Sequence, residues 1–179
     1  MSVKSSAADP CARIRIENTG SMDERAAIRA VNEAAFGGAY EADLVDQLRG
    51  SDYALISLVA EIEGRIVGHI MFSRMWINTA SGLLSAVALA PVAVLPGHQR
   101  KGIGSLLVRR GLELLRGRDE EILIVVGHPD YYPRFGFSSA KAESLESPFP
   151  REAFMALELR LGVLDGIEGE VVYPSVFGI

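Results

Sequence analysis

The chain has 179 residues, of which 49% are hydrophobic and 23% are charged, and its formal net charge is −5. These values are typical of a single globular domain with its own core, and the negative charge gives no electrostatic support for binding nucleic acid. The single cysteine, Cys11, excludes a disulfide within the chain, so a cytoplasmic protein is expected.

The sequence contains no stretch that predicts a membrane segment. The longest apolar run, residues 83–95, has about 13 residues and contains Pro91, whereas a membrane-spanning helix needs about 20. The first residues lack the apolar segment of a signal peptide. We expect a flexible tail over residues 1–12, followed by a single domain over residues 13–179.

The N-terminal part predicts one strand and two helices. Residues 12–18 (ARIRIEN) alternate between apolar and polar side chains, which predicts a strand. Residues 21–36 place apolar side chains on one helical face. Ser21 and Glu24 predict a capping box, in which each side chain satisfies the backbone N–H of the other residue. Residues 41–50 predict a second, short helix that is closed by a glycine.

The middle of the chain predicts a parallel pair of strands. Residues 53–78 indicate two strands around a tight turn. Residues 82–95 are almost entirely apolar, as in a central strand covered on both faces. A helix over residues 100–116 and an apolar strand over residues 121–127 follow. A strand, a helix and a strand in this order form a right-handed βαβ unit, so these two strands are expected to be parallel.

The last part of the chain completes the predicted sheet. Residues 129–137 (PDYYPRFGF) predict a turn of helix that enters a strand, and residues 153–160 (AFMALELR) predict a late strand. The remainder is interpreted as a glycine-rich tail segment that ends in VVYPSVFGI. Together, the elements predict an α/β fold with one mixed sheet and helices on both faces.

The turn before the predicted helix at residue 100, GHQRKGIGS, allows three interpretations as a phosphate-binding loop. A nucleoside-triphosphate P-loop is excluded, because Ile103 and Gly104 stand where that motif needs Lys and then Ser or Thr. A dinucleotide-binding turn is disfavoured, because Leu107 occupies its third glycine position. A simple anion cradle at a helix start fits, since unpaired N–H groups and the helix dipole attract phosphate there. The alternative is a glycine-rich helix start that binds nothing.

Pro91 interrupts a strand that otherwise looks central. Proline cannot donate a hydrogen bond to a neighbouring strand, so it marks a bulge or a break in pairing. A break beside an anion cradle leaves backbone groups free for an elongated, amide-bearing ligand that pairs there as a strand would. The alternative is a local kink with no ligand.

These residues resemble a known family. The segment VAVLPGHQRKGIGSLLV resembles the acyl-CoA site of GCN5-related N-acetyltransferases, whose signature is Gln or Arg, two residues, Gly, one residue, then Gly or Ala; residues 99–104 match it fully. A second family element, an aromatic pair before Gly-Phe, is matched by YYPRFGF at residues 131–137. The resemblance covers residues from about Ile14 to Phe177 and looks closest to an uncharacterised bacterial branch of acetyltransferases.

The resemblance implies the acyl-CoA N-acyltransferase fold: a mostly antiparallel sheet whose central parallel pair splays apart at a bulge. It implies acetyl-CoA as cosubstrate, with strand backbone pairing to the pantetheine arm and the cradle holding the pyrophosphate. The residues implied for this binding are Val92, Ala93, Val94, Gln99, Arg100, Lys101, Gly102, Gly104 and Ser105. Tyr132 matches the family's general acid, which protonates the departing CoA thiolate; the alternative is a core or lid tyrosine.

The chain lacks, at the family's usual position, the carboxylate that acts as the general base and deprotonates the incoming amine. Many members carry a glutamate on the strand before the cradle, whereas SAVALAPVAV has no carboxylate. Glu41 and His69 are possible neighbours of the acceptor, and neither is assigned a role. His98 and His128 flank the two ligand-binding turns, and no cluster at metal-ligand spacing is present, so no metal is expected.

The sequence therefore predicts an enzyme that transfers an acetyl group from acetyl-CoA directly to an amine. A non-catalytic acyl-CoA-binding sensor or partner module is the alternative. No nucleic-acid or membrane partner is expected. The acceptor stays open among a small molecule, a peptide N-terminus and a protein lysine, as do the use of other acyl-CoAs and the oligomeric state, with a homodimer possible.

Overall fold

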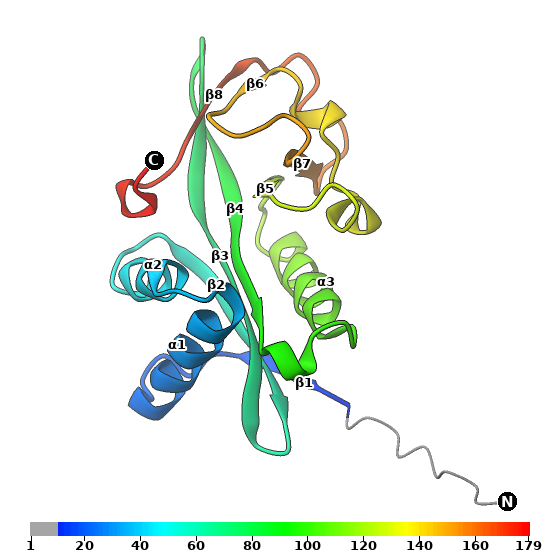
Figure 1. Cartoon of the computed structure of the whole chain (residues 1–179). Coiled ribbons are helices and arrows are strands. Elements are labelled where there is room, and N and C mark those ends of the chain that lie inside the picture. Colours follow the sequence, from blue (N-terminus) through cyan, green and yellow to red (C-terminus); the bar gives the residue numbers. More distant parts are fainter. Residues whose placement is uncertain (1–10) are drawn as a thin grey trace, which may run out of the picture.

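The computed structural model describes residues 11–179, so most of the tail predicted over residues 1–12 lies outside the described residues. The described part forms one sheet with helices on both faces (Figure 1). Its strands are β1 (Arg13–Ile16), β2 (Ala54–Ile62), β3 (Arg65–Thr79), β4 (Gly82–Val94), β5 (Ile122–Val126), β6 (Leu145–Glu146), β7 (Phe154–Glu158) and β8 (Gly169–Val172). Its α-helices are α1 (Met22–Phe36), α2 (Tyr40–Arg49) and α3 (Ile103–Arg116). No helix in residues 11–179 has the length and apolar composition needed to cross a membrane.

The sheet is mixed and mostly antiparallel, as predicted. The main strand order is β1-β2-β3-β4-β5-β7, and along this path only β4 and β5 are parallel. β8 pairs with the far end of β3, from Trp76 to Thr79, and in parallel with the short β6. The interpretation of the C-terminal segment as a tail was incomplete, because it contributes this strand to the sheet.

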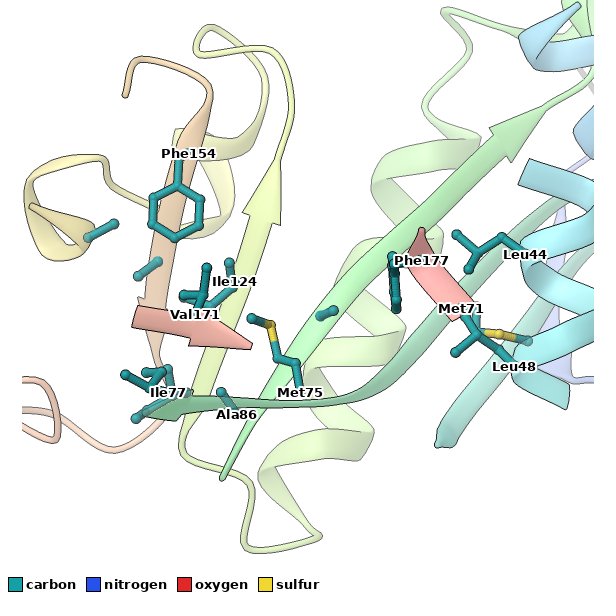
Figure 2. Close-up of a cluster of buried hydrophobic side chains, with 14 of the residues drawn as sticks. Leu44, Leu48, Met71, Met75, Ile77, Ala86, Ile124, Phe154, Val171 and Phe177 are labelled. Carbon is teal, nitrogen blue, oxygen red and sulfur yellow. The ribbon is translucent and has the colours of Figure 1, made fainter. Parts of the chain in front are cut away.

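The helices bury their apolar faces against opposite sides of the sheet. α1 and α2 cover one face and α3 covers the other (Figure 1). Figure 2 shows the core on the first side, where Leu48 of α2 and Met71 of β3 belong to one buried cluster. On the second side, Gly111 of α3 lies against Phe72, and an added Cβ at Gly111 would be 2.1 Å from the ring. α3 can therefore approach the sheet closely only because this position has no side chain.

The two central parallel strands separate beside Pro91, as predicted. β4 and β5 are paired only at Val87 with Leu123 and at Ala88 with Ile124, although both strands continue beyond this point. On the other edge of β4, the register with β3 shifts by one residue around Pro91. One extra residue in β4 is a β-bulge, which bends the strand away from its partner.

Three local predictions need correction. At the start of α1, the Ser21 hydroxyl accepts a bond from the Glu24 N–H at 3.2 Å, but the Glu24 carboxylate accepts from the Asn18 N–H rather than from Ser21. The reciprocal half of the capping box is therefore displaced to the preceding turn. α3 begins at Ile103, three residues later than predicted, because residues 100–102 form the turn. The strand expected after YYPRFGF is reduced to an isolated bridge between Ser138 and Ala156.

Candidate active site

The turn before α3 forms an open cradle of backbone N–H groups. Gly102 caps the helix in the left-handed conformation with φ of 84°, and Arg100 also has a positive φ of 61°. The bond from Leu106 N–H to the Gly102 carbonyl, at 3.0 Å, closes the first turn of α3. The N–H groups of the three helical residues before Leu106 precede this ladder, so they and the positive end of the helix dipole are available to an anion.

A pocket of about 740 Å³ lies over this cradle. Seven of the residues implied for CoA binding line it, namely Val92, Val94, Gln99, Arg100, Gly102, Gly104 and Ser105. Ala93 is 1% exposed, and by strand alternation its side chain faces the opposite side of the sheet from the pocket. Only the backbone of Ala93 is therefore available to a ligand that pairs with β4. Lys101 is not part of the pocket lining. Arg134 does line the pocket, although the sequence predicted no role for it.

Gln99 connects the cradle to the end of β4. Its side-chain Nε2 donates a hydrogen bond to the Val94 carbonyl at 2.9 Å. Val94 belongs to the part of β4 that lies beyond the last pair with β5. The signature glutamine thus satisfies a backbone acceptor at the strand end, a role that its sequence position alone did not reveal.

The two adjacent tyrosines occupy different surroundings. The Tyr131 hydroxyl lies 3.2 Å from Ser105 Oγ, and an added Cβ on Gly104 would lie 3.1 Å from the same hydroxyl. The Tyr132 ring packs on Gly127, where an added Cβ would lie 2.2 Å from it, and edge-on against Phe137. Burial, with a smaller contribution from Tyr131, raises the pKa of Tyr132 well above its usual value of 10. Tyr132 therefore keeps its proton at neutral pH.

A second pocket, of about 510 Å³, lies on the other side of the gap between β4 and β5. Its walls come from the end of α1, the start of α2, the bulged part of β4, the end of β5 and the C-terminal segment. Three residues line both pockets: Val92, His128 and Tyr132. The two pockets therefore adjoin where the central strands separate.

The structure separates the two residues that the sequence analysis named as neighbours of the acceptor. Glu41 lines the second pocket. His69 lies in the core, fully buried, with its ring nitrogens 3.2 Å from Asn32 Nδ2 and 2.9 Å from Ser57 Oγ. Burial, with a smaller contribution from the Arg49 charge, lowers the pKa of His69 to about 3, so the ring is neutral. His69 is thus a hydrogen-bonded core histidine outside both pockets.

His128 is the residue whose position the sequence analysis undervalued. It follows β5 and Gly127 directly, and its carbonyl accepts the Tyr131 N–H at 3.0 Å. The signal was its place immediately after a buried strand that ends at the site. Within residues 11–179, no group of three or more His, Cys, Asp or Glu side chains is arranged to hold a metal ion.

Comparisons with known proteins identify the family to which the chain is similar. A family model described as an acetyltransferase (GNAT) domain matches residues 16–140. The chain is 40% identical over 126 residues to the uncharacterised N-acetyltransferase YjhQ of Escherichia coli K12, covering 69% of this chain and 70% of the relative. It is 31% identical over 153 residues to the uncharacterised N-acetyltransferase YhbS of the same strain, covering 84% of this chain and 90% of the relative.

Solved structures show the same architecture. The crystal structure of E. coli YhbS in complex with CoA has a TM-score of 0.84 at 30% identity and covers 96% of both chains. A GNAT family acetyltransferase from Brucella melitensis in complex with acetyl-CoA has a TM-score of 0.76 at 34% identity, covering 94% of this chain and 99% of that one. Since the family model spans most of the chain and these relatives share at least 30% of their residues with it, the protein belongs to the GNAT family of acetyltransferases.

Proposed function

We propose that the protein transfers the acetyl group of acetyl-CoA directly to an amine, with Tyr132 as the general acid. The observation that carries the proposal is that Tyr132 lies where the two pockets adjoin, beside the gap between β4 and β5. If the thioester of acetyl-CoA lies in this gap, the CoA portion extends into the first pocket. The amine then approaches the thioester from the second pocket.

The first pocket suits acetyl-CoA. The N–H groups of residues 100–105 and the dipole of α3 would hold the pyrophosphate, and the edge of β4 at Val92–Val94 would pair with the pantetheine amides. A backbone N–H on this edge would also stabilise the negative charge that develops on the thioester oxygen. The CoA-bound and acetyl-CoA-bound structures of relatives support this assignment.

The reaction requires two proton movements. The amine nitrogen forms a bond to the acetyl carbon, and the carbon–sulfur bond breaks. Tyr132, which is protonated at neutral pH even at the ordinary tyrosine pKa of about 10, would give its proton to the leaving sulfur. The attacking ammonium must first lose a proton, and β4 supplies no carboxylate for this step. We assign this role to His128, which lines both pockets and is exposed, so it can pass the proton on to solvent.

The proposal is tested by mixing the purified protein with acetyl-CoA and a panel of amines while measuring thiol release and the acetylated product by mass spectrometry. We expect thiol release that depends on the amine and matches product one to one. Tight CoA binding without any turnover across the panel would contradict the proposal of an enzyme. It would indicate a non-catalytic acyl-CoA-binding module instead. No CoA binding at all would contradict both.

A further inference from the structure

The second pocket, on the acceptor side, is lined by an unusual share of the protein's aromatic residues. Six of the thirteen aromatic side chains in the chain contribute to it: Phe36, Tyr40, Tyr132, Phe149, Tyr173 and Phe177. Its volume of about 510 Å³ lies within the range of small-molecule sites. The lining therefore favours a small ligand with a flat or bulky apolar body.

The aromatic walls are held together by contacts between distant segments. Tyr173 packs edge-on against Phe149 and at 5.1 Å, centroid to centroid, against Phe177. The Tyr40 hydroxyl donates a hydrogen bond of 2.6 Å to the Phe177 carbonyl, which ties the start of α2 to the C-terminal segment. The pocket is thus formed before any ligand arrives, which reduces the entropic cost of binding.

The charged lining side chains of the second pocket favour a cation over an anion. Glu41 is the only acidic side chain among the described lining residues, and none of them is a lysine or arginine. A carboxylate beside apolar walls attracts a cation more strongly than it would in bulk water, and aromatic faces add a further attraction. An acceptor with its own carboxylate would find no lysine or arginine to pair with, and a polyamine would bring additional charges for which the described lining offers no further acidic side chain.

We infer that the acceptor is a primary amine carried on an aromatic body without a carboxylate, with Glu41 attracting its ammonium group. This inference rests on the proposed function for its chemical outcome, whereas the pocket's preference for an aromatic cation can be measured by binding alone. It narrows the acceptor to a small molecule of the arylalkylamine type.

The binding experiment uses phenethyltrimethylammonium, which carries a permanent charge and cannot be acetylated, and butyltrimethylammonium as its non-aromatic counterpart. Titration calorimetry with the full chain should show the aromatic ion binding at least about tenfold more tightly. Glu41→Gln should weaken that binding by about 10- to 100-fold. Glu113→Gln removes the same charge from an exposed site on α3 and should leave binding unchanged. Phe36→Ala, at a half-exposed position, should weaken the aromatic ion more than the aliphatic one.

The activity experiment compares kcat/KM for phenethylamine, butylamine, phenylalanine and spermidine at saturating acetyl-CoA. Phenethylamine should be preferred by at least about tenfold over each of the others. Efficient transfer with a preference for phenylalanine or spermidine would overturn the inference and leave the proposed function standing. Binding of the aromatic ion that depends on Glu41, without transfer to any amine, would support the pocket's ligand class and overturn the proposed function. Equal binding of both quaternary ions would overturn the inference directly.

Discussion

The Tyr131 hydroxyl lies 3.2 Å from Ser105 Oγ in the first turn of α3, whereas the ring of the next residue, Tyr132, packs on Gly127 at the junction of the two pockets. Consecutive residues of one aromatic pair thus serve different parts of the site. Tyr131 lines the first pocket beside the start of α3, and Tyr132 lines both pockets. The family resemblance already implied the general-acid position for Tyr132, whereas the surroundings of Tyr131 come from the tertiary structure alone.

Replacing each tyrosine separately should separate the two roles. Tyr132→Phe removes the proton donor and keeps the ring on Gly127, so kcat should fall by about 10²- to 10⁴-fold with little change in CoA affinity. Tyr131→Phe should alter the Kd for CoA and leave kcat within a few-fold of wild type. Steady-state kinetics and calorimetry with CoA provide both numbers. If Tyr132→Phe keeps a near-normal kcat, the general-acid assignment is wrong.

Gly104→Val tests the cradle. Its Cβ would meet the Tyr131 hydroxyl at 3.1 Å and place methyl groups between the first turn of α3 and the ligand. Gly104 has no positive φ, so the backbone should tolerate valine, whereas Gly102 at φ 84° would also be strained. We expect CoA affinity to fall by at least about tenfold while the melting temperature changes little. Gly38→Val, at an open position away from the cradle, is the control. A folded Gly104→Val protein with wild-type CoA affinity would refute the cradle.

His128→Gln should impair the enzyme in a manner that depends on pH. At neutral pH most of the amine is an ammonium, so losing the base should lower kcat/KM by about 10²-fold or more. At pH values approaching the pKa of the amine, free amine is already present and the deficit should shrink. His98→Gln, in a residue that lines only the first pocket, should show no such trend. A deficit that stays constant across pH would exclude His128 as the base.

The buried His69 should make the protein less stable in mild acid. In the unfolded chain His69 takes up a proton as the pH falls through about 6.5, whereas burial lowers the folded pKa to about 3. Between these values the unfolded state binds more protons, so this group's contribution to stability is complete above about pH 6.5 and is lost below it, by at most ~1.4 kcal/mol per pH unit.

Denaturant titrations between pH 7.5 and 5 measure this slope. His69→Leu should be less stable overall, because Asn32 and Ser57 lose a partner, but its stability should vary less with pH than that of wild type. His128→Gln, in an exposed residue, should keep the wild-type slope. Equal slopes for His69→Leu and wild type would show that burial does not lower the pKa of His69.

Local sequence patterns were sufficient to predict the features that depend on neighbouring residues. The helix stop at Gly37, the turn at Gly64, the cradle at Gly102 and the bulge at Pro91 all follow from the backbone preferences of single residues. The order of strand, helix and strand determined the parallel pair, because a right-handed crossover is the only common solution. The main features of the fold and the geometry of the turn before α3 were therefore predictable.

The second pocket and the surroundings of the histidines depend on contacts between distant segments of the chain. The second pocket joins Tyr40 with Phe177, which lie 137 positions apart, so no local periodicity connects them. His69 and His128 both stand at or just after apolar strands in the sequence. His69 is buried in the core, where it contacts Asn32 and Ser57. His128 lies where β4 and β5 separate and lines both pockets. Side-chain pattern places a residue on a strand, but the packing of distant segments decides whether that residue is buried or meets a ligand.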